Sequence, residues 1–270
     1  MVNKPTKVPR RRLDQAMVER GLAESRARAQ ALILAQDVLV NGQTISKAGA
    51  PVGPGDEIVL KAPPRFVSRG GEKLDHALAA FDVDVAGKTA ADFGASTGGF
   101  TDALLQRGAV RVYAIDVGYG QMAEKLRLDP RVVVMDRQNV RTVTALPEPV
   151  SVVSIDVSFI GLHLVLPAAR AVLAPDGEIV ALVKPQFEAG RADVGKGGVV
   201  RDPAVHERVL RDVMTAADAL GLGVNGITAS PLLGPAGNRE FLLHLKPGAA
   251  TIDVERAVDA AVHVGGHRDS

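Results

Sequence analysis

Apolar residues between positions 70 and 247 follow two alternating periodicities. Short apolar runs are typical of buried strands, and between them apolar residues recur every three or four positions, as on one face of a helix. The predicted strands are residues 89–93, 110–115, 132–135, 152–155, 179–183, 223–229 and 240–245. Helices are predicted around Leu74, Leu78 and Phe81, over 99–106 and over 204–220. This alternation predicts an α/β domain built on a mainly parallel sheet.

A glycine-rich turn joins the first predicted strand to the helix that follows it. Gly94 and Gly98 lack a Cβ, so the backbone can turn sharply and approach a ligand closely. The spacing Asp-x-Gly-x-x-x-Gly differs from the dinucleotide fingerprint, because Ser96 stands where that fingerprint has its second glycine. The turn therefore suits a cofactor without a pyrophosphate, such as S-adenosylmethionine, whose positive charges Asp92 could approach. The loop alone leaves open a tight turn with no ligand.

Polar side chains follow the second to fifth predicted strands where each strand ends. Asp116 ends the second strand, where an acid commonly accepts hydrogen bonds from ribose hydroxyls. Asp136 is placed to meet an adenine edge or the cofactor's amino group, and Asp156 and Lys184 end the next two strands. One such acid is often only a helix N-cap, but the ends of successive parallel strands converge on one crevice. The predicted cofactor-binding residues are Asp92, Gly94, Ala95, Ser96, Gly98, Gly99, Asp116 and Asp136.

A second, smaller domain is predicted over residues 12–61. Apolar residues at helical spacing, a stop at Gly21 and an N-cap at Ser25 predict two short helices. Short strands are predicted at 38–40, which Asn41-Gly42 would turn, and at 57–60. Ahead of this domain, residues 1–11 are predicted to form a flexible basic arm.

Positive charge is concentrated at this end of the chain, although the formal net charge of the whole sequence is only +1. Such a concentration favours a polyanionic partner, and a solvated helix face is the alternative explanation. The residues predicted to contact such a partner are Arg10, Arg11, Arg12, Arg26 and Arg28. The sequence has no cysteine, which excludes disulfides and thiolate metal sites, and no apolar run long enough to span a bilayer. We expect a cytoplasmic protein without a metal cofactor.

Several runs of uncommon residues resemble one family. They are Ser68-Arg69-Gly70-Gly71-Glu72-Lys73-Leu74, Gly94-Ala95-Ser96-Thr97-Gly98-Gly99-Phe100-Thr101, Asp116-Val117-Gly118-Tyr119-Gly120-Gln121, Leu182-Val183-Lys184-Pro185-Gln186-Phe187-Glu188, and Ser230-Pro231 with Gly237-Asn238-Arg239-Glu240. In these motifs the chain resembles the TlyA family, haemolysin-like methyltransferases that modify a ribose 2′-hydroxyl of ribosomal RNA. The resemblance extends from about Arg12 to Leu245, and the N-terminal part is similar to an S4-type RNA-binding domain.

The resemblance implies a class I, Rossmann-like fold with seven strands that uses S-adenosylmethionine, preceded by a small α+β S4-like domain. Its implied parts are an S4-like domain at 12–61, a linker at 62–69, a methyltransferase domain similar to FtsJ/RrmJ at 70–247, and a C-terminal helix or tail at 248–270. The linker departs from the family pattern, because mycobacterial members have Arg-x-Trp-Val where this chain has Pro64-Arg65-Phe66-Val67.

The same resemblance implies a catalytic set of Lys73, Asp156, Lys184 and Glu240. Methyl transfer from a sulfonium needs in-line alignment and a group that draws on the hydroxyl proton. Lys184 is expected to act on the hydroxyl, with Lys73 as its electrostatic neighbour and the two carboxylates holding the lysines. The implied acceptor is a cytidine ribose of 23S rRNA, in ribosomal subunits, with 16S rRNA as a second target of the longer family members.

Two other functions are weighed against this one. A methyltransferase acting on a base, or on another RNA, would keep the same fold. Base-nitrogen enzymes often carry Asn/Asp-Pro-Pro-aromatic after the fourth strand, whereas this chain has Asp156-Val157-Ser158-Phe159, which favours ribose. A membrane-lytic protein, as the haemolysin name suggests, would need a spanning segment or a strongly amphipathic lytic helix, and the sequence shows neither.

Overall fold

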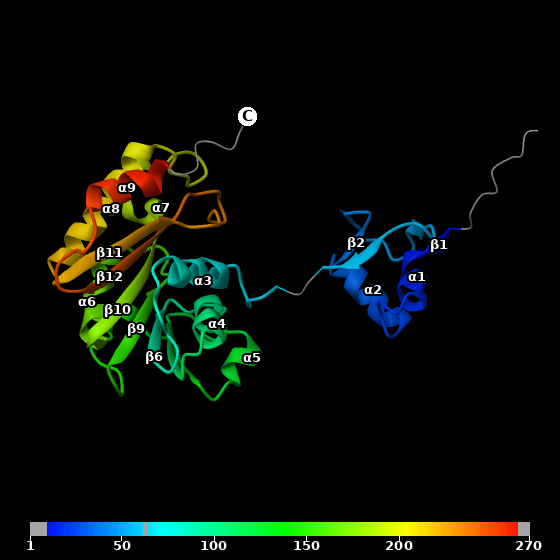
Figure 1. Cartoon of the computed structure of the whole chain (residues 1–270), viewed down its shortest axis with the longest axis horizontal. Coiled ribbons are helices and arrows are strands. Elements are labelled where there is room, and N and C mark those ends of the chain that lie inside the picture. The colour runs from blue at the N-terminus through cyan, green and yellow to red at the C-terminus, as the bar shows by residue number, and fades with distance from the viewer. Residues whose placement is uncertain (1–9, 62–63, 264–270) are drawn as a thin grey trace, which may run out of the picture. The chain divides into compact units, whose positions relative to one another are not determined.

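The computed structural model describes residues 10–61 and 64–263. They belong to two compact units that divide between Arg65 and Phe66 (Figure 1). Parts of three predicted segments lie outside the described residues: the arm at 1–9, the linker at 62–63 and the tail at 264–270.

The smaller unit packs two helices against short strands. Its elements are β1 (Arg11–Arg12), α1 (Leu13–Glu19), α2 (Arg26–Leu34), β2 (Val38–Val40), β3 (Gln43–Thr44), β4 (Pro51–Val52) and β5 (Ile58–Leu60). Ser25 caps α2 by accepting a hydrogen bond from the backbone N of Arg28 at 3.2 Å. Asn41 and Gly42, both with positive φ, form the turn between β2 and β3. The order β3-β2-β5 forms one antiparallel sheet, and β1 pairs with β4, a pair that the apolar pattern did not predict.

A buried carboxylate organises the arginines of this unit. Asp14 is fully buried, and its oxygens accept hydrogen bonds from Arg12 and Arg26 at 2.8–3.0 Å. The bonds from Arg12 above all hold the pKa of Asp14 well below its usual range. Arg11 pairs with Glu19, whose side chain is about half exposed. Three of the five arginines predicted to contact RNA thus have acidic partners within the unit, although Arg12 and Arg26 remain about half exposed.

The larger unit is built on a seven-stranded sheet. Its strands are β6 (Thr89–Phe93), β7 (Arg111–Asp116), β8 (Val132–Asp136), β9 (Val150–Ile155), β10 (Leu173–Val183), β11 (Leu222–Ala229) and β12 (Phe241–Pro247). The spatial order is β11-β12-β10-β9-β6-β7-β8. Strands β6 to β10 pair in parallel, whereas β12 runs antiparallel to both of its neighbours. The predicted seven-stranded α/β fold is confirmed, with β9 and β10 beginning earlier than their apolar runs.

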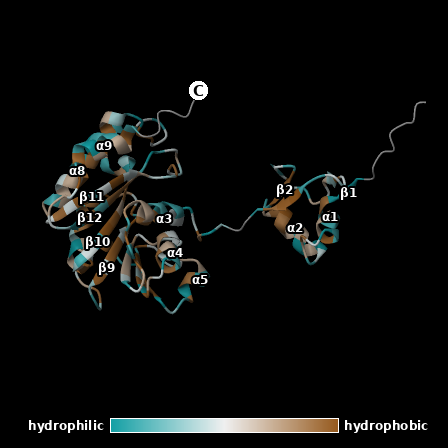
Figure 2. Ribbon diagram, in the orientation of Figure 1, coloured by the Kyte–Doolittle hydropathy of each residue, from teal (hydrophilic) through white to brown (hydrophobic). Residues whose placement is uncertain are grey.

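Helices cover both faces of this sheet (Figure 1). One face packs against α3 (Gly70–Ala80), α4 (Gly99–Gln106) and α5 (Glu124–Arg127), and the other against α6 (Leu166–Val172), α8 (Pro203–Asp218) and α9 (Val254–His263). Figure 2 shows the hydrophobic residues gathered on the central strands. Burial on both faces explains why the parallel strands appear in the sequence as continuous apolar runs. No helix within residues 10–61 or 64–263 is long and apolar enough to cross a membrane.

The start of the larger unit includes residues that the sequence assigned to the linker. Phe66 is buried, and its ring packs so closely on Gly71 that a Cβ there would lie 2.3 Å from the ring carbon Cγ. The backbone N of Val67 donates a hydrogen bond to the Asp102 carboxylate at 2.9 Å. Phe66 is therefore part of the fold of the larger unit.

Candidate active site

The carboxyl ends of β6, β7, β9 and β10 meet at one edge of the sheet, where the antiparallel β12 begins. Gly94 follows β6 with a φ of 88°, and a Cβ there would lie 2.4 Å from the carbonyl oxygen of Asp156. The backbone N of Asp156 in turn donates to the carbonyl of Phe93 at 2.9 Å. A side chain at position 94 would force these two strand ends apart, so only glycine fits.

Two cavities adjoin at this edge, both lined by residues of the larger unit. The lysine cavity, of about 560 Å³, is lined by Lys73, Lys184 and Glu240 among others. The Asp116 cavity, of about 490 Å³, is lined by Asp116 and Asn139 among others. Both volumes are typical of small-molecule sites. The residues that line both cavities are Gly94, Ser96, Asp156, Ser158 and Phe159.

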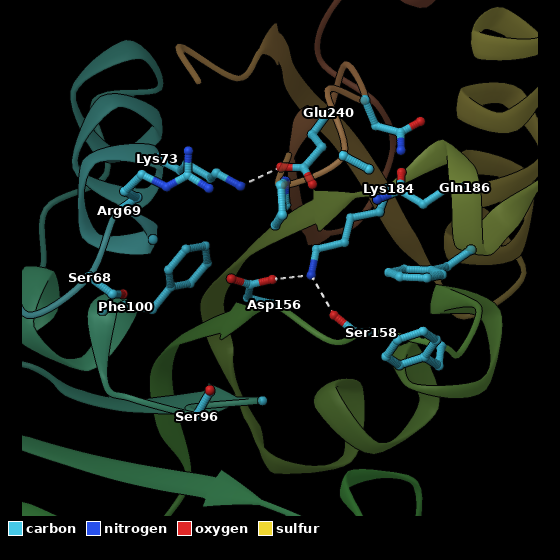
Figure 3. Close-up of a pocket in the computed structure, with 18 of the residues that line it drawn as sticks. Ser68, Arg69, Lys73, Ser96, Phe100, Asp156, Ser158, Lys184, Gln186 and Glu240 are labelled. Atoms are coloured by element: carbon cyan, nitrogen blue, oxygen red, sulfur yellow. Dashed lines mark hydrogen bonds and ion pairs between the residues drawn. The ribbon is translucent and has the colours of Figure 1, made fainter. Parts of the chain in front are cut away.

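Two lysine–carboxylate pairs face the lysine cavity (Figure 3). Lys184 Nζ lies 2.6 Å from Asp156 Oδ1 and donates a hydrogen bond to Ser158 Oγ at 2.9 Å. Lys73, on the first turns of α3, pairs with Glu240, which directly precedes β12. The four residues implied by the family resemblance therefore lie in one cavity and in two matched pairs.

Burial makes each carboxylate necessary to its lysine. The side chains of Lys73 and Glu240 are only 9% and 1% exposed, and that of Lys184 is 11% exposed. A charge removed from water at this depth is tolerated only when it is paired. The sequence marks Lys73 as unfavourable to the dipole of its own helix, and Glu240 supplies the opposite charge. The cavity thus holds two amines at fixed positions, which suits chemistry on a hydroxyl.

Several predicted cofactor-binding residues line the two cavities. They are Gly94, Ala95, Ser96, Gly99 and Asp116. Asp116 is held firmly, because Oδ2 accepts a hydrogen bond from the backbone N of Ser96 at 2.8 Å and Oδ1 accepts one from that of Gly118 at 2.6 Å. The carboxylate therefore joins the glycine turn to the loop after β7. This arrangement fits the nucleoside part of a cofactor beside a glycine turn.

Three other predicted cofactor-binding residues line neither cavity. Asp92 is fully buried and accepts hydrogen bonds from Thr101 Oγ1 at 2.7 Å and Ser154 Oγ at 3.0 Å. A Cβ at Gly98 would lie 2.3 Å from the side chain of Leu126. Asp136 pairs with Arg127 at 2.9 Å. Because side chains alternate along a strand, Asp92 points to α4 and supports the glycine turn from the side away from the cavities. The sequence had instead predicted that Asp92 contacts the cofactor.

The buried position of Asp92 predicts a particular pH dependence of stability. Burial raises the pKa of Asp92 to about 7, so between about pH 4 and pH 7 the folded protein retains a proton that the unfolded chain has lost. The free energy that this carboxyl contributes to folding therefore falls as pH rises through that window. Asp92→Asn stays neutral, and its free energy of unfolding relative to wild type should rise by on the order of 2–4 kcal/mol between pH 4 and pH 8.

Chemical denaturation of both proteins at several pH values measures this difference. Asp82→Asn, at an exposed turn, is the control. A difference between Asp92→Asn and wild type that does not change with pH would show that Asp92 is ionised in the folded protein.

The structure adds residues to which the sequence assigned no role. Ser158 holds Lys184, and Arg69 and Gln186 line the lysine cavity. Phe159 is 88% exposed at the wall shared by the two cavities, with its ring centroid 4.8 Å from that of Phe187. Arg69, Gln186 and Phe187 lie inside motifs that carried the family resemblance, whereas Ser158 and Phe159 lie in the run that follows Asp156.

Comparison with known proteins matches both units. A family model for FtsJ-like methyltransferases matches residues 66–247, and one for the S4 domain matches residues 11–58. The chain is 46% identical to the 16S/23S rRNA (cytidine-2'-O)-methyltransferase TlyA of Mycobacterium tuberculosis (strain ATCC 25618 / H37Rv), over 94% of this chain and 96% of the relative.

Two further matches agree with this one. A Bacillus subtilis (strain 168) protein named as an rRNA methyltransferase, YqxC, is 50% identical over 87% of this chain and 85% of its own. A solved structure from Streptococcus thermophilus, described as a hemolysin, is 44% identical with a TM-score of 0.73 and covers 94% of this chain and 95% of its own.

Proposed function

The chain belongs to the TlyA family, and from this membership we propose that it transfers a methyl group from S-adenosylmethionine to the 2′-hydroxyl of a cytidine in ribosomal RNA. Relatives of known name act on 23S rRNA or on both 16S and 23S rRNA. In the structure, the proposal is supported by the two lysine–carboxylate pairs, which lie in a cavity that the glycine turn also lines.

The cofactor would supply a methyl group made electrophilic by a sulfonium. Asp116 is placed to accept hydrogen bonds from the ribose hydroxyls of the cofactor. Gly94 and Ser96 line the same cavity, so the cofactor would lie against the backbone of the glycine turn. The shared wall of the two cavities, with Asp156 and Ser158, is then where cofactor and acceptor meet.

Lys184 is proposed to act on the acceptor hydroxyl, because its Nζ contacts Asp156 and Ser158 of this shared wall. Asp156 and Ser158 fix its position, so that hydroxyl oxygen and methyl group are held in line. Lys73, fixed by Glu240, places a second amine in the same cavity, where it can donate a hydrogen bond to the phosphate or ribose of the target. Phe159 offers an exposed ring on which the target base can stack.

The smaller unit is proposed to bind the RNA, as its S4 domain match suggests. Arg28 and the still half-exposed Arg12 and Arg26 present positive charge there. Asp14 holds two of these arginines, so it also orders the surface that would meet phosphate groups. We propose a cytoplasmic location, where ribosomal RNA is found.

Asp116→Ala should weaken binding of S-adenosylmethionine roughly 10- to 100-fold, the loss expected when a charged group no longer accepts hydrogen bonds. The fold should persist, because Asp116 is at a strand end and is not core. Isothermal titration calorimetry without RNA measures the affinity. Asp129→Ala, an acid paired within its own turn, is the matched control. Equal affinities in the two variants would contradict the assigned role of Asp116.

The proposed reaction is tested by methyl transfer from tritiated S-adenosylmethionine to ribosomal RNA, followed by digestion to nucleosides. Label on the ribose of cytidine supports the proposal, and label on a base shows an enzyme of the alternative kind. Leakage of liposomes caused by the purified protein would support the lytic alternative.

A further inference from the structure

One wall of the lysine cavity is formed by backbone. Gly197 and Gly198 line this cavity together with Lys184 and Glu240. The φ angles of the two glycines are 80° and 76°, a region that other residues rarely adopt. They lie in the segment Gly195-Lys196-Gly197-Gly198, between α7 (Pro185–Glu188) and α8.

A buried clamp holds this segment in place. Asn238 is 1% exposed; its Oδ1 accepts a hydrogen bond from the backbone N of Val200 at 2.9 Å, and its Nδ2 donates one to the carbonyl of Gly198 at 2.8 Å. His206, also 1% exposed, has Nε2 at 3.0 Å from the carbonyl oxygen of Val200. Two buried polar side chains thus fix a short exposed segment against the cavity, which indicates that its shape matters for what enters.

The charge of the segment suits an anion. The lysines already named in the cavity, Lys73 and Lys184, are both paired with carboxylates. Lys196 is exposed and forms no ion pair within the part of the chain that the structure describes. An anion that enters beside Gly197 and Gly198 would reach backbone that carries no side chain, and the exposed Lys196 directly precedes these glycines, although it does not itself line the cavity.

We propose that residues 195–198 bind the phosphodiester next to the acceptor ribose, and that Asn238 is the positioning residue that holds them. In RNA the 2′-carbon is bonded to the carbon that carries the 3′-phosphate, so a hydroxyl at Lys184 brings a phosphate into the same cavity. Backbone N–H groups and lysine are common phosphate ligands that set the register of a nucleic acid. The N–H groups of Gly195 and Gly198 donate to the carbonyls of Val199 and Gly195, which leaves those of Lys196 and Gly197 to bind the phosphate. The inference rests on the proposed function, because it presupposes an RNA acceptor.

Lys196→Ala tests the phosphate contact. The KM for ribosomal RNA in tritium transfer should rise roughly threefold to tenfold, and the slope of log affinity against log salt should fall by about 0.7–0.9, as for one lost phosphate contact. The kcat at saturating RNA and the affinity for S-adenosylmethionine should not change. Lys88→Ala is the matched control, because Lys88 directly precedes β6, at the opposite edge of the sheet.

Asn238→Ala tests the positioning role, with Asn225→Ala as the control, since Asn225 also donates an amide hydrogen bond to a glycine carbonyl, within β11. We expect Asn238→Ala to raise the KM for RNA and to leave S-adenosylmethionine binding intact. Loss of cofactor binding in Asn238→Ala would overturn the positioning role. For the phosphate contact, equal slopes of log affinity against log salt in Lys196→Ala and Lys88→Ala would overturn the proposal. A wild-type protein that transfers no methyl group to RNA would instead refute the proposed function.

Discussion

Lys184→Ala should reduce the rate of methyl transfer at least 100-fold, the lower range for removal of a group that assists proton transfer. Lys184 lines the lysine cavity, and Asp156 and Ser158, which line both cavities, hold its Nζ. Binding of S-adenosylmethionine and of RNA should be retained, because neither depends on this one side chain. Single-turnover transfer with saturating cofactor and RNA separates the chemical step from binding.

Lys246→Ala is the matched control for this prediction. Lys246 also pairs with a carboxylate, Glu178, at 3.2 Å, but it lies at the far end of β12 from Glu240. Its loss should leave the transfer rate near that of wild type. Wild-type turnover in Lys184→Ala would make Lys73 the residue that acts on the hydroxyl. The transfer rate of Glu240→Ala should lie between those of wild type and Lys184→Ala, because Glu240 holds a lysine and takes no proton itself.

A protein that begins at Arg65 should fold and bind S-adenosylmethionine but should lose methylation of ribosomal RNA. The larger unit contains the whole seven-stranded sheet, both cavities and the packing of Phe66 on Gly71. It lacks the arginines of the smaller unit. Each lost phosphate contact lowers the slope of log affinity against log salt by about 0.7–0.9, so the loss of two contacts lowers it by about 1.4–1.8. We therefore expect the truncated protein to bind RNA more weakly than the full chain and with a shallower dependence on salt.

Filter binding and tritium transfer across a salt series measure this loss for the truncated and full-length proteins. Circular dichroism and calorimetry with S-adenosylmethionine show whether the truncated protein has kept its fold and cofactor site. If the truncated protein binds RNA as well as the full chain does, the larger unit finds its target unaided and the proposed division of labour is wrong.

The sheet could be predicted from the sequence because its strands are buried on both faces and leave unbroken apolar runs. The glycine turn was equally readable, since the close approach of Gly94 to Asp156 excludes any side chain. Strands of two residues, such as β1 and β4, are too short to leave a pattern. The first residues of β9 and β10 likewise lie outside the apolar runs from which these two strands were predicted.

The partners of the site residues could not be read from spacing. Lys73 and Glu240 are 167 positions apart, and only the family resemblance placed them in one set. The direction of a strand-end carboxylate is also decided in three dimensions. Asp116 faces its cavity, whereas Asp92 turns toward Thr101 and Ser154. The pairing of Arg12 and Arg26 with Asp14 could not be predicted either, because net charge does not tell which acids lie beside which bases.

Mapping 2′-O-methyl groups in ribosomal RNA checks the claim that this chain methylates a cytidine ribose there. Ribose methylation protects the neighbouring phosphodiester from alkali, so ribosomal RNA from cells with and without the gene can be compared at each nucleotide. We predict an alkali-resistant cytidine that is present with the gene, absent without it, and restored by wild-type protein but not by Lys184→Ala. Identical protection patterns in the two RNA samples, or a gene-dependent methyl group on a base, would contradict the claim.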